Sequence, residues 1–250
     1  VYVQTPTSTG TSTVPMNLGK QVSQGLTATL NYMILQRENM SWNFNFNARH
    51  ITYEYRNIGT ALDKFNQENR SSNLVRYYDG GSPSDLWAVR SAGIDPASGQ
   101  EVYIKKNGNY TFAYDKNERV EVGNTNPMLE GSLFTSLSYG GFTLNVTAAY
   151  KFGGDIYNTT LANKVEYIDP YGNVDRRAFT ERWKKPGDLV RFLGIPENVS
   201  DENRYSERFV ERDNTFAITS IMLNYEFKPG YLRKIGIKRL NLGIGVADIA

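Results

Sequence analysis

The residues of this chain that could do chemistry are few. There is one histidine, His50, and no cysteine, so a metal site or a catalytic triad would have to be built on a single imidazole on a predicted strand. The sequence contains no G-x-S-x-G nucleophile elbow, no phosphate-binding loop and no G-x-G-x-x-G motif. Its acidic residues are scattered without the pairing typical of glycosidases. We therefore predict no catalytic residues, no metal site, no cofactor and no enzymatic activity.

Two tryptophans are the candidates for contact with a solute. Trp87 and Trp183 each lie in a long connection rich in turn signals, such as Asp95–Gly99 and 169–172. Their rings could stack on sugar rings, or they could pack the connections against one another. Both roles remain open from the sequence, which does not otherwise identify the residues that bind a substrate.

Six segments carry the period-2 alternation of long β-strands and must position these residues. They are 22–36, 40–56, 129–139, 142–157, 213–227 and 237–248. Short joins at 37–39, 140–141 and 228–236 alternate with two long connections, 58–128 and 158–212. Short turns at one end and long loops at the other are typical of an outer-membrane β-barrel. We expect an all-β, antiparallel fold in which the two long connections are extracellular.

The alternation also predicts which side chains share a face. Phe44, Leu144, Val146 and Leu242 fall on one side of their strands, and we expect them to meet lipid. A second set is expected to face the lumen: Asn43, Asn45, Thr143 and Asn145. A soluble β-sandwich alternates in the same way, so the asymmetry of the loops is what favours the barrel.

Details within the segments agree with a membrane wall. A set of aromatic residues lies close to the short joins, as in an interfacial girdle: Trp42, Tyr139, Phe142, Tyr225 and Phe227. In 40–56 the apolar phase changes after Arg49-His50, which predicts either a β-bulge or the point where the strand leaves lipid. A short helix is predicted at 61–69 in the first long connection.

Composition narrows the function classes. The chain has 250 residues, is 40% hydrophobic and has a net charge of +2. No apolar run is long enough for a transmembrane helix, and no basic stripe indicates nucleic acid as a partner. Val1 does not begin a signal peptide, and Ala250 does not follow a terminal aromatic residue. We expect the chain to be an internal part of a longer protein.

Several phrases, in serial order over nearly the whole chain, resemble the C-terminal barrel of the SusC/RagA family of TonB-dependent outer-membrane transporters. They include STVPMNLG (12–19), AGIDPASGQEVY (92–103), GNTNPMLEGSL (123–133), RWKKPGD (182–188), RFVER (208–212), IMLNYEF (221–227) and RLNLGIGV (239–246). Gly140-Gly141 and the Val246-Ala-Asp ending depart from the wording usual in the family.

The resemblance implies that residues 1–250 are part of a transmembrane barrel of about 22 strands. It implies an N-terminal plug that this chain lacks, energy from TonB through that missing region, and a SusD-like surface lipoprotein as partner. The implied substrate is a polar solute, either an oligosaccharide or a peptide. The implied location is the outer membrane, in contact with its lipid.

Two other functions stay open. A soluble β-rich module that binds carbohydrate or serves an adhesin would show similar alternation, and a passive porin would show similar loops. Porin strands are shorter than these, and the phrases above favour active import.

Overall fold

The computed structural model describes residues 2–4, 13–15, 19–68, 74–168, 173–194, 204–232 and 236–249. The chain forms two compact units, each built from three segments. The sheet unit is Gln24–Thr52, Pro127–Gly154 and Asp213–Ala250. The loop unit is Val1–Ser23, Tyr53–Asn126 and Asp155–Arg212.

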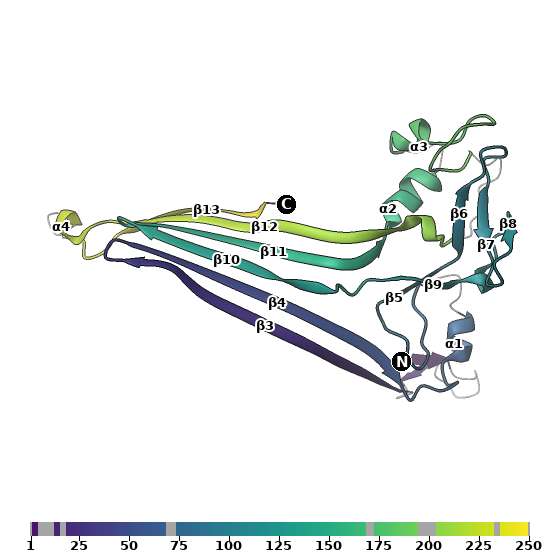
Figure 1. The fold of residues 1–250 in the computed structure, drawn as a ribbon, viewed down its shortest axis with the longest axis horizontal. Coiled ribbons are helices and arrows are strands. Elements are labelled where there is room, and N and C mark those ends of the chain that lie inside the picture. The colour runs from purple at the N-terminus through teal and green to yellow at the C-terminus, as the bar shows by residue number, and fades with distance from the viewer. Residues whose placement is uncertain are drawn as a thin grey trace. The chain divides into compact units, whose positions relative to one another are not determined.

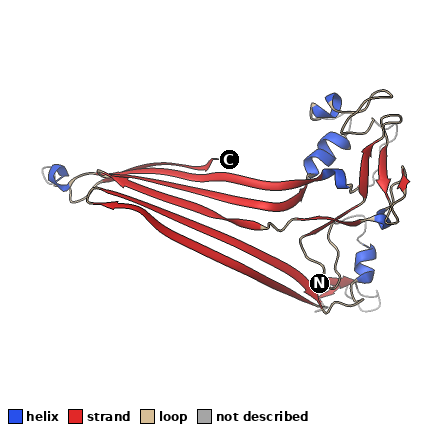
Figure 2. Cartoon of the chain, in the orientation of Figure 1, coloured by secondary structure: helices blue, strands red, loops and turns tan. Residues whose placement is uncertain are grey.

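The sheet unit is built on one antiparallel sheet of six strands, in the order β13-β12-β11-β10-β4-β3 (Figures 1 and 2). Four of its strands continue past the unit's bounds. The strands are β3 (Lys20–Arg37), β4 (Met40–Arg56), β10 (Leu129–Tyr139), β11 (Phe142–Tyr157), β12 (Val210–Glu226) and β13 (Asn241–Ile249). The sheet confirms all six predicted strands and the all-β, antiparallel class.

The largest difference from prediction is the start of the last strand, which begins at Asn241 and not at 237. The β12–β13 ladder ends at Glu226–Asn241. Beyond it the chain forms a helical turn, α4 (Pro229–Leu232), in which Pro229 has no N–H to donate to a ladder. The residues before Asn241 therefore have no strand opposite them.

The turn at Gly140-Gly141 sets the register of the central hairpin. Both glycines have positive φ, 58° and 98°, as the central residues of a type I′ hairpin turn require. The ladder then runs without interruption from Tyr139–Phe142 to Leu129–Phe152. On its other side β10 pairs with β4 in unbroken register as far as Arg49–Glu130. No bulge interrupts that ladder, so the phase change after Arg49 coincides with the place where β4 outlasts β10.

The long connections hold short elements of their own. Strand β5 (Asp85–Ala88) pairs with β9 (Val120–Asn124). Strand β7 (Glu101–Ile104) lies between two others, β6 (Arg90–Ile94) and β8 (Tyr110–Thr111). Strands β1 (Tyr2–Gln4) and β2 (Thr13–Pro15) form a further pair. Helix α1 (Asp63–Glu68) lies within the predicted segment 61–69.

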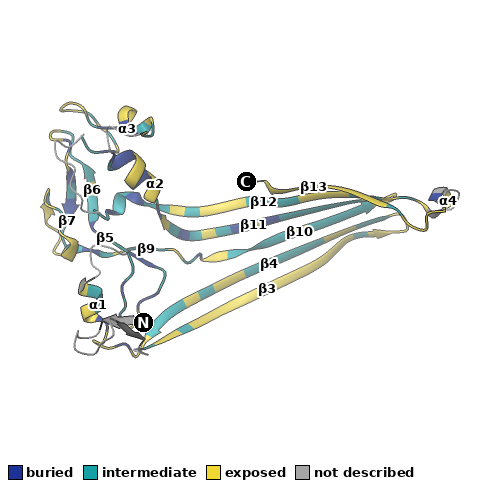
Figure 3. Cartoon of the chain, turned by 180° about the vertical axis from the view of Figure 1, so that it is seen from behind, coloured by how far each residue is buried: buried dark blue, intermediate teal, exposed yellow. Residues whose placement is uncertain are grey.

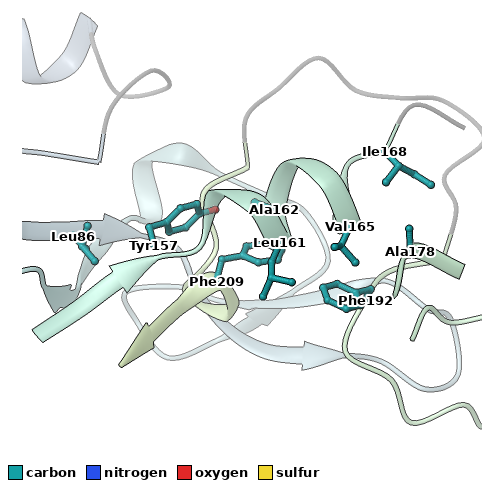
Figure 4. Close-up of a cluster of buried hydrophobic side chains, with 9 residues drawn as sticks. All are labelled: Leu86, Tyr157, Leu161, Ala162, Val165, Ile168, Ala178, Phe192 and Phe209. Carbon is teal, nitrogen blue, oxygen red and sulfur yellow. The ribbon is translucent and has the colours of Figure 1, made fainter. Parts of the chain in front are cut away.

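The helices described in the second connection are short helical turns, and the connection packs on the first. Its elements are α2 (Thr159–Leu161), η3 (Ala162–Glu166), α3 (Arg177–Thr180) and η4 (Glu207–Phe209); a further turn, η2 (Lys116–Glu118), belongs to the first connection. Leu86 of the first connection shares one buried cluster with residues of the second (Figure 4). Phe192 and Phe209 of that cluster are fully buried. Burial of these apolar side chains makes the two connections one folded body.

The sheet, in contrast, buries little. Strands β3 and β13 are exposed along almost their whole length (Figure 3). Large apolar side chains remain uncovered there, including Leu26 at 74% and Ile244 at 72% exposure. None of the described helices has the length and apolar character to cross a membrane.

Candidate functional site

The sheet has one polar face, which we take as the candidate site. Cross-strand register aligns Asn43, Ser136 and Asn145 in one row. The central strands contribute these residues to it: Asn43, Asn45, Asn47, Ser132, Ser136, Ser138, Thr143, Asn145 and Thr147. Phe134 is an aromatic exception in this set. The grouping confirms that Asn43, Asn45, Thr143 and Asn145 share a face, as their period predicted.

Amides and hydroxyls on this face bind one another across strands. The Nδ2 atom of Asn47 donates to Thr29 Oγ1 at 2.9 Å, and that of Asn45 donates to Asn31 Oδ1. The hydroxyls of Ser138 and Thr143 lie 3.0 Å apart. Such groups keep spare donor and acceptor capacity, which a polar solute can use.

Four charges of alternating sign cross the polar face in one row. Arg49 lies opposite Glu130 in the ladder, with a 2.6 Å ion pair, and Glu130 lies opposite Lys151. Lys151 in turn pairs with Asp213. Arg49, Glu130 and Lys151 of this row line an open hollow of about 640 Å³, together with residues such as Asn47 and Thr215. We call these four residues the charge row.

The sequence did not identify the charge row. Its members are at positions 49, 130, 151 and 213, and only the strand register brings them together. A signal for two of them was present, because Arg49 continues the phase of Asn43 to Asn47, and Lys151 continues that of Thr143 to Thr147.

The opposite face is apolar, and its few polar groups are internally bonded. Phe44 and Val146 lie on it on either side of Thr135. The Thr135 hydroxyl accepts from Trp42 Nε1 at 2.8 Å and donates to the carbonyl of Asn43. A face that meets hydrocarbon must satisfy its polar groups in this way.

A tyrosine packs over the one glycine of β10 on the same face. A Cβ atom at Gly131 would lie 2.7 Å from the hydroxyl of Tyr150, which donates to the carbonyl of Asn47 at 2.9 Å. The Tyr150 ring stacks on Phe46 at 5.8 Å between ring centroids. The ring therefore covers the backbone that glycine leaves bare and fixes three strands together.

Trp183 is half-buried and joins the two long connections. Its Nε1 donates to the carbonyl of Pro96 at 2.9 Å, and its ring packs on Gly99 and Gly194. Asp95 organises the predicted turn by accepting hydrogen bonds from the backbone of Ala97 and Ser98. The second predicted turn, at 169–172, lies outside the described residues.

Trp87 is also half-buried, on β5. Its ring meets Tyr78 edge to face at 5.6 Å, and its Nε1 has no hydrogen-bond partner among the described residues. Both tryptophans thus make packing contacts within the connections.

A buried ion cluster links the same two connections. The guanidinium of Arg208 pairs with Glu101 at 2.9 Å and with Glu166 at 2.6 Å. The two carboxylate side chains are 1% and 0% exposed. Ser206 also donates to Glu101. Glu101 belongs to the first connection and Glu166 to the second, so Arg208 holds both.

Burial and the shared guanidinium shift the pKa values in this cluster. Burial opposes ionisation of Glu101, but the hydrogen bonds and charge of Arg208 outweigh it and lower the pKa of Glu101. Burial dominates at Glu166 and raises the pKa of that carboxyl group. Burial also disfavours the charged form of Arg208, yet the two carboxylates raise its pKa. Arg208 therefore stays charged.

His50, the lone histidine, lies on β4, and its Nδ1 is 2.7 Å from the carbonyl oxygen of Met128. A carbonyl oxygen only accepts, so Nδ1 carries the proton of this contact. Within the described part of the chain, no three side chains of histidine, aspartate or glutamate gather as metal ligands would.

Comparison with known proteins gives this geometry a context. No protein-family model matches the chain. The chain is similar to TonB-dependent receptor P39 of Formosa agariphila, with 21% identity over 296 aligned residues. The alignment covers 99% of this chain and 28% of the receptor, so the chain spans just over a quarter of that relative.

Solved structures share the fold of this chain. The RagAB peptide transporter matches with a TM-score of 0.75 and 14% identity, over 98% of this chain and 28% of that one. The RagAB peptide importer in its closed-closed state matches with a TM-score of 0.77 and 14% identity, over 99% and 28%. The fold is therefore that of part of the RagAB barrel, and the resemblance to SusC/RagA transporters is confirmed.

Proposed function

We propose, from the similarity to a TonB-dependent receptor and the shared fold with RagAB, that this chain is the wall and the extracellular loops of an outer-membrane TonB-dependent importer. The observation that carries the proposal is the two-faced sheet. One face holds amides, hydroxyls and the charge row, and the other holds uncovered aromatic and aliphatic side chains. A wall between lipid and an aqueous lumen needs these two faces.

The edges of the sheet support the same proposal. Among the described strands, β3 and β13 each have one neighbour, so each offers a long row of unpaired backbone groups. Exposed edges of this length promote aggregation unless further strands cover them. We propose that strands from the rest of the protein continue the sheet on both sides and close the barrel.

The partners belong to the proposal as well. We propose that a SusD-like lipoprotein binds on the extracellular side and that TonB acts through a plug outside these residues. The cargo is a polar solute, an oligosaccharide or a peptide. The polar face supports this class because it offers many weak hydrogen bonds and charges of both signs, which suit passage better than tight capture.

The test is uptake of a labelled oligosaccharide and a labelled peptide by cells that carry the full-length protein, with and without TonB. We expect uptake of one solute to require both the protein and TonB. Uptake that depends on the protein but persists without TonB would show a passive porin. If residues 1–250 proved soluble, monomeric and able to bind ligand, a binding module would replace the importer.

A further inference from the structure

The hairpin between β7 and β8 carries the one Asn-Gly pair of the sequence, Asn107-Gly108. The Gly108 N–H donates to the carbonyl of Lys105 at 2.9 Å, and the Lys105 N–H donates to the carbonyl of Asn109 at 2.9 Å. Gly108 has a positive φ of 87°. These features define a three-residue hairpin loop, in which a type I turn is followed by a residue in the left-handed conformation.

The loop brings together two groups that can react with each other. The Oδ1 atom of Asn107 accepts from the N–H of Asn109 at 3.0 Å. An asparagine bonded in this way folds its carboxamide over the peptide bond that follows it, which brings its Cγ atom close to the Gly108 nitrogen. Gly108 has no Cβ to obstruct the approach, and nothing lies within 4 Å of the place where one would be. The Nδ2 group of Asn107 makes no hydrogen bond within the described part of the chain.

The loop is open to water and weakly held. Residues 106–110 are all exposed, and β8 has only two residues. Reaction requires the hydrogen bond from Gly108 to Lys105 to open, and exposed bonds beside a short strand open at little cost in free energy. The base of the loop is fixed, since the N–H of Lys106 donates to Glu118 at 2.7 Å. The opening is therefore confined to the tip.

We propose that Asn107 is a site of spontaneous deamidation in the first long connection. The Gly108 nitrogen attacks Cγ of Asn107, so that an N–Cγ bond forms and the Cγ–Nδ2 bond breaks. Ammonia leaves with the proton of the Gly108 amide, and a cyclic imide remains. Water then opens the imide at either carbonyl and gives aspartate or isoaspartate at position 107. The reaction consumes one water molecule and needs no oxidant or reductant.

Both products change the tip of the hairpin. Each replaces a neutral amide by a carboxylate beside Lys106. Isoaspartate also adds a methylene group to the backbone between Lys105 and Asn109, so the two hydrogen bonds of Lys105 lose their spacing. The surface of this connection therefore changes as the protein ages. The inference concerns this hairpin alone and does not depend on the proposed import.

Mass spectrometry of the full-length protein in detergent tests the site. The protein is incubated in mildly alkaline buffer made with water enriched in heavy oxygen, and is then digested in ordinary water. Hydrolysis of the imide during incubation puts heavy oxygen into the product, which distinguishes it from deamidation during digestion. The tryptic peptide 107–116 contains both Asn107 and Asn109. We expect heavy oxygen at position 107, in aspartate and isoaspartate, and none at Asn109, because Tyr110 hinders attack there.

Variants identify the cause. Asp tolerates the left-handed conformation better than most residues with a side chain, so Gly108→Asp adds a Cβ at little cost and should strongly reduce the labelling. Thr111→Ser, in the same hairpin, should leave it unchanged. Persistent labelling in Gly108→Asp, or equal labelling of Asn107 and Asn109, would overturn the proposal. An unmodified Asn107 under conditions that deamidate a synthetic peptide of residues 101–116 would do the same.

Discussion

Arg208 links the two long connections of the loop unit through one buried ion cluster. It neutralises two buried carboxylates from two different connections. Removing one partner of a buried ion pair leaves an uncompensated charge, which costs about 3–5 kcal/mol. A protein that has to keep large loops ordered outside the sheet gains from such a shared contact.

Arg208→Met should therefore destabilise the loop unit by about 3–5 kcal/mol. The measurement is amide hydrogen exchange of peptides from both connections in the full-length protein. Arg212→Met is the matched control, because its ion pair with Asp155 lies at an arginine that is 71% exposed. An exposed pair contributes about 1 kcal/mol or less. Equal effects of the two substitutions would contradict the role of the buried cluster.

The lowered pKa of Glu101 gives the loop unit a pH dependence. Burial opposes the shift, but Arg208 holds the folded pKa below the ordinary 4.5. Such a group stabilises the fold above its unfolded pKa, and the contribution is lost as the pH falls through the folded pKa. We expect the loop unit of the full-length protein to become less stable as the pH falls below 4.5, measured by amide hydrogen exchange of peptides from both connections after correction for the intrinsic effect of pH.

Glu101→Gln should reduce this loss of stability at low pH, which we call the acid limb. The pH dependence that Glu166 contributes has the opposite sign. Burial raises the pKa of Glu166, so its contribution to stability is lost as the pH rises above 4.5. Glu166→Gln should therefore leave the acid limb in place. An acid limb that survives in Glu101→Gln would assign the dependence to other groups.

At the scale of the strand, alternation decides what each position tolerates. Val146 and Asn145 are neighbours in β11 with opposite faces. An arginine at Val146 would enter hydrocarbon, and one at Asn145 would enter a polar lumen. We expect Val146→Arg to destabilise the folded barrel by roughly 2–4 kcal/mol if this level lies near the bilayer midplane, and Asn145→Arg by much less.

Reversible unfolding of the full-length protein in lipid vesicles measures this difference. The pair is a matched control in itself, since both substitutions introduce the same side chain one residue apart. Equal destabilisation would mean that the two faces meet similar surroundings, which would contradict a barrel wall.

At the scale of the whole molecule, the alternation of short and long connections predicts opposite sides of a membrane. These 250 residues contain no cysteine, so labelling above that of the unsubstituted full-length protein reports the introduced thiol. Asn117 lies in the first long connection and Asn39 in a short turn, and both are exposed. On intact cells an impermeant maleimide should label Asn117→Cys and spare Asn39→Cys. Labelling of Asn39→Cys alone would invert the topology.

Local signals in the sequence were enough to predict the strands and the two faces. A period of two and a Gly-Gly turn act over a few residues, so they specify strand direction, side-chain alternation and hairpin register without distant partners. Helix α1 was predicted from the sequence because its signals are also local. The start of β13 was missed by several residues, because that boundary depends on where its partner β12 ends.

The sequence by itself determined a two-faced antiparallel wall with long connections at one end. Only the tertiary structure decided which distant side chains meet. The charge row joins residues from 49 to 213, and Arg208 reaches Glu101 across 107 positions. The packing of Trp183 on Gly99 also depends on how the connections fold together. Charges and hydrogen bonds act over a few ångströms in space. The number of residues between two positions does not give that distance, which is set only when the strand register and the core have formed.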